Sequence, residues 1–219
     1  MGAVVRSMSY WPKSNYVFPP PTLFIHIPKT AGITIQDWYR NTYGKFYKCM
    51  HGDVRHPMIE EELKHTPGWC VVRNPYDLVF SWYRYKRQML TEKRHRDPVE
   101  LQHWQVGFEN WLERYIDKMN YTNDKMTRGF NLISPSKCQL DYITGRDGEI
   151  KVKWILRFET LAEDIEQINT YVAGNYQIQH KNKTEIQIKN NYRAAYTAKG
   201  RKLVEKYYAR DLEYFGYEF

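Results

Sequence analysis

Two short segments combine cationic and hydroxyl side chains where an apolar run stops. The first, HIPKTAGIT, places Lys29, Thr30 and Thr34 directly after such a run. Its small residues, Ala31 and Gly32, let the backbone come close to a ligand. The N–H groups that open a helix have no partner within it and bind anions well. The segment therefore predicts a phosphate site, although short turns of this composition also occur where no anion binds.

The second segment, VVRNPYDLVFSWYRY, starts from an arginine at the end of an apolar run. A charge at the end of a buried strand needs a partner or a ligand, because burying it unpaired is costly. Asn74-Pro75 then opens a helix, and Ser81 follows Arg73 by about two helical turns. Two interpretations remain open here: Arg73 forms a structural ion pair with Asp77, or it binds an anionic ligand.

The surrounding pattern indicates the elements that must hold these segments. Apolar runs predict buried strands, and apolar positions at helical spacing predict helices between them. This alternation favours an α/β fold with a mostly parallel central sheet flanked by helices, in which ligands bind beyond the carboxyl ends of the strands. The strands are expected at 22–27, 69–73 and 153–158, and the helices from 35, from 75, and at 107–119, 136–145, 159–174 and 199–217.

Length and charge narrow the possible functions. The chain has 219 residues, which suits one domain at 22–219 after an N-terminal extension at 1–21. A formal net charge of +8 predicts an anionic ligand without choosing among nucleic acid, nucleotide and sulfated substrate. No apolar segment is long enough for a membrane span or a signal peptide, and the three Cys are widely spaced, so we expect a cytoplasmic protein.

Taken together, the two motifs resemble those of sulfotransferases that use 3′-phosphoadenosine 5′-phosphosulfate (PAPS). FIHIPKTAGIT is similar to the 5′-phosphosulfate loop of that family, and VVRNPYDLVFSWYRY is similar to its 3′-phosphate motif. WILRFETLAEDI and YYARDLEYFGYEF resemble later blocks of the carbohydrate-type branch, which includes heparan and uronyl-type enzymes and bacterial members. The resemblance spans about Thr22 to Phe219. It implies a three-layer, P-loop-like fold, PAPS as cosubstrate, 3′-phosphoadenosine 5′-phosphate (PAP) as product, and no metal.

The resemblance also assigns roles to single residues. Lys29 would contact the bridging oxygen and the leaving 5′-phosphate, and Arg73 and Ser81 would hold the 3′-phosphate. Lys183 would belong to a loop that closes over the nucleotide, unless that polar segment is only a solvated loop. The phosphate cradle would consist of Thr30, Ala31, Gly32, Ile33 and Thr34. Ile33 departs from the family pattern, which usually has a hydroxyl residue there.

The implied reaction is in-line sulfuryl transfer to an acceptor hydroxyl or amine, and a general base must take the acceptor's proton. His51 is the first candidate, because related enzymes often supply a base between the two motifs; a solvated loop histidine is the alternative. His56 comes second, and it could instead start a helix before Pro57. The acidic run at 60–62 is expected on a solvated helix face, and His26 is expected as a hydrogen-bonded core residue.

Two other classes of function stay open at this point. A basic protein that binds nucleic acid or another polyanion without chemistry would use the same cations, but it has no need for them at these particular strand ends. A P-loop nucleotide kinase needs G-x-x-x-x-G-K-[ST], whereas Lys29 precedes Gly32.

For the acceptor, a glycan, a tyrosyl peptide and a small alcohol all fit, and the 16% aromatic content favours a glycan. Arg84, Lys86 and Arg87 are expected on a solvated helix face.

Overall fold

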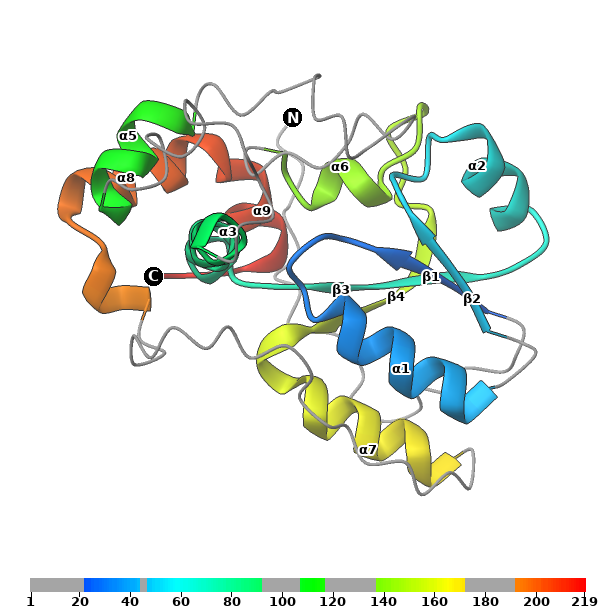
Figure 1. Ribbon diagram of the computed structural model, residues 1–219. Coiled ribbons are helices and arrows are strands. Elements are labelled where there is room, and N and C mark those ends of the chain that lie inside the picture. The colour runs from blue at the N-terminus through cyan, green and yellow to red at the C-terminus, as the bar shows by residue number, and fades with distance from the viewer. Residues whose placement is uncertain (1–21, 44–46, 92–106, 117–136, 172–191) are drawn as a thin grey trace.

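Four parallel strands form the centre of the computed structural model (Figure 1), which describes residues 22–43, 47–91, 107–116, 137–171 and 192–219. The order across the sheet is β2-β1-β3-β4, and all three neighbouring pairs are parallel. The carboxyl ends of all four strands therefore meet at one edge. The strands are β1 (Thr22–His26), β2 (Tyr47–His51), β3 (Gly68–Val72) and β4 (Val152–Arg157).

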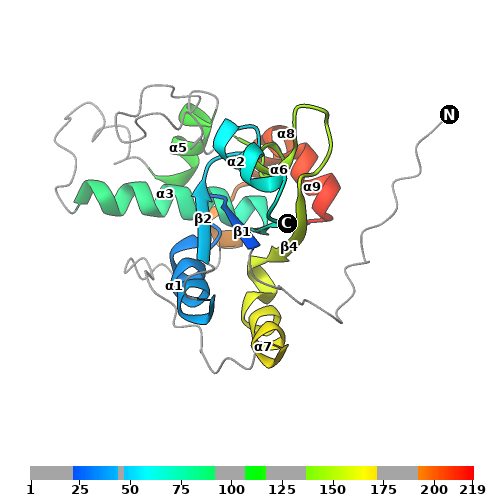
Figure 2. The same cartoon turned by 90° about the vertical axis from the view of Figure 1, so that its right-hand side faces the viewer.

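Side chains alternate between the two faces of the sheet, as the period of two requires. Phe24, Trp69 and Leu156 pack on one face with α1 (Gly32–Tyr43) and α7 (Leu161–Tyr171). Leu23 and Val72 pack on the other face with α2 (Pro57–Leu63), α6 (Leu140–Ile143) and α9 (Ala209–Phe215). Figures 1 and 2 show these helices on opposite sides of the sheet. Burial on both faces explains why β1 and β3 read as continuous apolar runs.

A second core forms beyond the carboxyl edge of the sheet. It joins α3 (Pro75–Thr91), α5 (Phe108–Tyr115) and α8 (Ala198–Tyr207), and Trp111 and Tyr208 are fully buried within it. Short 3₁₀ turns at Phe158–Thr160 and Tyr192–Ala195 complete the described elements. This core holds α3 against the strand ends (Figure 1).

The structure confirms the predicted three-layer α/β fold and corrects three details. The helix expected at 136–145 is shorter and covers only Leu140–Ile143. Strand β2 was not predicted, and the expected helix at 199–217 is two helices that break at the buried Tyr208, whose φ and ψ are −112° and 20°. The extension at 1–21 lies outside the described residues, so the domain boundary stays a prediction. Within the described part of the chain, no helix is long and apolar enough to span a membrane.

Candidate anion site at the strand ends

The loop between β1 and α1 has the backbone geometry of an anion cradle. Lys29 and Ala31 have positive φ values of 68° and 67°, and Thr30 stands between them with negative φ. Alternation of this kind turns successive N–H groups toward a common concavity that suits phosphate oxygens. A residue other than glycine in this region is strained, and such strain is concentrated at functional sites.

The start of α1 adds further N–H groups to this loop. The first helical bond runs from Ile35 N to Ala31 O at 3.0 Å. The amides of Gly32, Ile33 and Thr34 therefore precede the helical ladder, at the positive end of the helix dipole. The backbone geometry thus supports the predicted cradle from Thr30 to Thr34.

The side chains of the cradle differ from expectation in one respect. Thr30 is fully buried, and its hydroxyl donates to Ile27 O at 2.8 Å, so its group for an anion is the backbone N–H. Thr34 is also buried, whereas Ile33 is 54% exposed. Ile33 therefore presents an apolar surface at the mouth of the loop, where the family usually has a hydroxyl.

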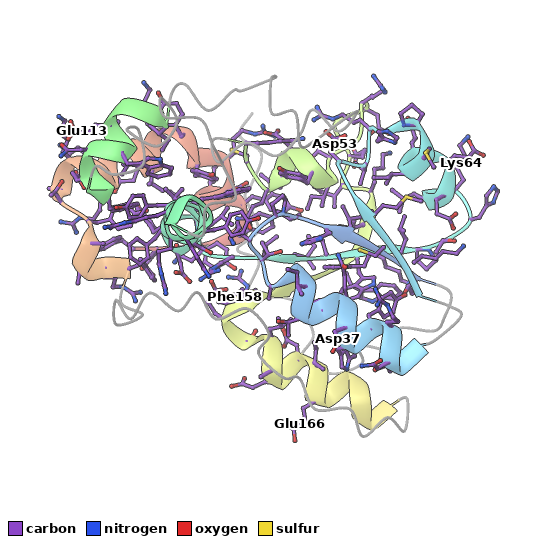
Figure 3. The ribbon with its side chains drawn as sticks, in the orientation of Figure 1. Asp37, Asp53, Lys64, Glu113, Phe158 and Glu166 are labelled. Atoms are coloured by element: carbon purple, nitrogen blue, oxygen red, sulfur yellow. The ribbon has the colours of Figure 1, made fainter. Side chains whose placement is uncertain are left out.

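Arg73 joins the second motif directly to this loop. Its Nη1 donates to Lys29 O at 2.9 Å, and its Nε donates to Asp77 Oδ2 at 2.8 Å. Its Nη2 lies 2.7 Å from the same carboxylate oxygen, and its guanidinium stacks 3.9 Å from the ring centre of Phe158, which lies where β4 leads toward α7 (Figure 3). The ion pair with Asp77 forms as one interpretation predicted. It does not exclude a ligand, because each terminal nitrogen carries a second N–H.

One face of α3 turns toward the loop. Asp77 contacts Arg73, and the Tyr85 ring lies 3.8 Å from Lys29 Nζ. Ser81 is four residues from each of them, so it shares their face of the helix. This spacing agrees with the prediction that Ser81 faces Lys29 and Arg73.

The electrostatics of this cluster favour an anion. Burial, together with the neighbouring Arg73 and Arg84, lowers the pKa of Lys29 to about 7. Burial and Arg73 also lower the pKa of Arg84. Asp77 acts in the opposite direction, but its effect is smaller. Among the described residues, Lys29, Arg73 and Arg84 thus lie close enough to repel one another, and a multiply charged anion would relieve their repulsion.

Arg84 corrects the expectation of a solvated helix face. It is half-buried and near enough to Lys29 and Arg73 to alter the pKa values in the cluster, whereas Arg87 is exposed and donates to Tyr83 Oη at 3.1 Å. Sequence spacing missed Arg84 and Tyr85 as site residues. Helical spacing could have indicated both residues, since each follows Ser81 by about one turn.

The candidate bases have different surroundings. His51 ends β2, and its Cα pairs with that of His26, so its backbone lies at the carboxyl edge beside the strand that leads to Lys29. The side chain of His51 and all of Lys183 lie outside the described residues. His56 caps α2 through Nδ1, which accepts from Met58 N at 3.3 Å, as the helix-start interpretation predicted. His26 is a buried residue whose Nδ1 lies 2.9 Å from Gln36 Nε2.

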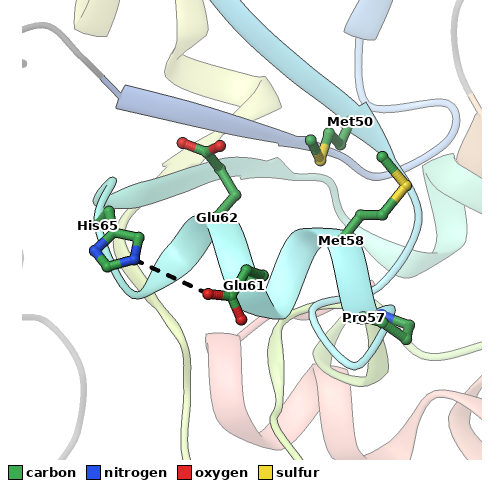
Figure 4. A pocket seen from close by; sticks show the side chains of 6 residues that line it. All are labelled: Met50, Pro57, Met58, Glu61, Glu62 and His65. Atoms are coloured by element: carbon green, nitrogen blue, oxygen red, sulfur yellow. Dashed lines mark ion pairs between the residues drawn. The ribbon is translucent and has the colours of Figure 1, made fainter.

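An open pocket elsewhere belongs to neither phosphate motif. It lies between β2 and α2 (Figure 4), and its lining residues are Met50, Pro57, Met58, Glu61, Glu62 and His65. Glu61 and His65 face each other across 4.0 Å, and Glu62 pairs with Lys48 at 2.6 Å. Among the described residues, no group of three His, Cys, Asp or Glu side chains is placed to hold a metal ion.

Comparison with known proteins gives one match, to a family model. Neither the search of curated proteins nor that of solved structures finds a match. The model of the sulfotransferase family, however, matches residues 21–218, which is nearly the whole chain. The chain therefore belongs to the sulfotransferase family, whose members are PAPS-dependent transferases.

Proposed function

We propose that this sulfotransferase moves a sulfuryl group from PAPS to a hydroxyl or amine of a carbohydrate acceptor. One observation carries the proposal: a loop with anion-cradle geometry is joined by Arg73 to a second cationic motif, and the positive charges of Arg73 and Arg84 lower the pKa of Lys29 in that loop. PAPS carries negative groups at both its 5′ and 3′ ends, so it needs two such motifs side by side. The resemblance of the later sequence blocks to carbohydrate-acting enzymes supports the acceptor class.

The residues present fit this cosubstrate. Bound PAPS supplies the sulfuryl group: its bond to the bridging 5′-phosphate oxygen breaks as a bond to the acceptor oxygen or nitrogen forms, and PAP departs. The cradle amides and Lys29 stabilise charge that grows on the leaving phosphate. A nearby phosphate raises the pKa of Lys29 from about 7, so the amine is an ammonium when it is needed.

His51 is the proposed general base, which accepts the acceptor's proton. Its support is its place at the end of β2, on the same sheet edge as the Lys29 loop. The His51→Ala variant should lower turnover steeply while PAP affinity is kept. Near-normal turnover would remove His51 from this role. A steep loss of turnover in His56→Ala instead would assign the base to His56, which caps α2.

The decisive experiment is a transfer assay with labelled PAPS against a panel of glycans, phenols and peptides. Transfer to a glycan supports the full proposal, whereas transfer only to a phenol or a tyrosyl peptide would replace the acceptor class. A location in the cytoplasm is a separate proposal, which fractionation of the source cells would test.

Calorimetry tests the two other classes of function. Tight binding of PAP without Mg²⁺ is expected here. Binding of ATP only with Mg²⁺ would favour a nucleotide kinase. Binding of any polyanion with equal affinity, and with a steep loss in salt, would favour a non-catalytic polyanion binder.

A further inference from the structure

Gln139, just before α6, clamps the backbone of Arg73 although 66 residues separate them. Its Oε1 accepts from Arg73 N at 2.8 Å, and its Nε2 donates to Arg73 O at 2.8 Å. Gln139 is fully buried. One side-chain amide thus satisfies both backbone groups of the arginine, as a neighbouring strand would do within the sheet.

Asp211, on α9, fixes the orientation of this amide. Its Oδ2 accepts from Gln139 N at 2.7 Å and its Oδ1 accepts from Leu140 N at 3.0 Å. The Nε2 of Gln139 lies 3.3 Å from Asp211 Oδ2. Because the Asp211 carboxylate accepts hydrogen bonds, the Gln139 amide must turn its NH2 group toward Asp211 and its carbonyl oxygen toward Arg73 N.

The clamp matters because Arg73 follows the last residue of β3. At this position the regular ladder no longer holds the backbone, yet the guanidinium must meet Lys29 O, Asp77 and a phosphate with fixed geometry. A small rotation of the Arg73 backbone would displace the guanidinium, several bonds away, by a larger distance.

We propose that Gln139 is a positioning residue for binding of the 3′-phosphate, and that Asp211 acts through it. Neither residue contacts the ligand; they set where Arg73 places its guanidinium. The inference rests on the proposed function, in which Arg73 holds the 3′-phosphate of PAPS. It extends that function to a network of three residues: Arg73 after β3, Gln139 before α6 and Asp211 on α9.

The test compares two nucleotides by calorimetry: PAP, and AMP, which lacks the 3′-phosphate. In the Gln139→Met variant, which keeps the side-chain length and loses both hydrogen bonds, the Kd for PAP should rise about tenfold. The Kd for AMP should stay within about twofold, because AMP makes no contact through Arg73. Ile143→Val on α6 is the matched control, since it trims a fully buried core residue without touching Arg73, and it should change neither Kd.

Combining Gln139→Met with Arg73→Met distinguishes the positioning role of Gln139 from a purely structural role. If Gln139 acts through Arg73, Gln139→Met has no further effect on PAP binding in the Arg73→Met background. The milder Asp211→Asn variant gives the same readout if Gln139→Met does not fold, with a smaller loss of preference for PAP over AMP. If the wild type prefers PAP over AMP and the Gln139→Met variant keeps this preference, the positioning role is wrong and the proposed function stands. A wild-type protein that binds PAP and AMP equally would overturn both this role and the proposed function.

Discussion

Arg73 Nη1 donates a hydrogen bond across 2.9 Å to the carbonyl oxygen of Lys29, a residue 44 positions earlier in the chain. The two residues follow β1 and β3, which are neighbours in the sheet. Lys29 takes its left-handed conformation at this contact. This hydrogen bond therefore joins the two phosphate motifs directly.

PAP affinity should fall as pH rises above about 7, through Lys29. Its pKa is about 7 in the free protein, and bound phosphates return it toward the ordinary value of 10.5. Between these values the complex holds more protons than the free protein, so the association constant falls by up to about tenfold per pH unit. Phosphate groups, whose second pKa is about 6, are almost fully ionised above pH 7.5 and contribute little there.

Calorimetry between pH 7.5 and 9.5, in buffers of different ionisation enthalpy, measures the slope. Extending the titration to about pH 6 locates the midpoint of proton uptake, with Lys29→Met as the reference for protonation of the phosphates. Lys29→Met should bind PAP more weakly at pH 7.5 and should show no slope. The same slope in Lys29→Met as in the wild type would assign the titration to another group.

Arg84→Met should weaken PAP binding severalfold, because it removes a half-buried cation from the cluster. It should also move the midpoint of proton uptake to higher pH, since Arg84 is one of the charges that lower the pKa of Lys29. Arg87→Met, at an exposed position on the same helix, is the control and should change neither quantity. Equal effects of the two variants would mean that Arg84 acts only through net charge.

Tyr85→Leu should move the midpoint of proton uptake to lower pH by roughly 0.4 to 1.5 units. The ring face, 3.8 Å from Lys29 Nζ, favours the ammonium form through a cation–π contact of about 0.5–2 kcal/mol. Tyr85→Phe keeps the ring and should behave like the wild type. If Tyr85→Phe shifts the midpoint as much as Tyr85→Leu does, the hydroxyl and not the ring is responsible.

Much of the fold could be predicted because β1 and β3 are buried on both faces and therefore stand out as apolar runs. Strand β2 could not, because it lies at the edge of the sheet, and YKCMH mixes polar and apolar residues. The break at Tyr208 was missed because the apolar positions continue through it, and only packing against the second core separates α8 from α9.

The site shows the same division between local and long-range signals. Lys29, Arg73 and Ser81 could be proposed because each stands at a recognisable position in a motif. The clamp by Gln139 could not, since its partners are 66 residues or more away and no spacing in the sequence connects them. Arg84 was misjudged because a dense charged run usually marks a solvated face, and the phase of α3 against the loop decides which of its charges turn inward.

Gly32→Ala should destabilise the protein through His26. A Cβ at this position would lie 1.6 Å from His26 Nε2, within the buried imidazole ring that rests on the first turn of α1. The ring also meets Gln36 on the same helix, so it has little freedom to move aside. We expect a loss of about 1–3 kcal/mol in the free energy of unfolding, measured with urea, together with weaker PAP binding as α1 shifts. In the double variant Gly32→Ala/His26→Ala, the space left by the imidazole accepts the new methyl group. Its loss should therefore be smaller than the sum of the two single losses, and strictly additive losses would show that the two residues do not constrain each other.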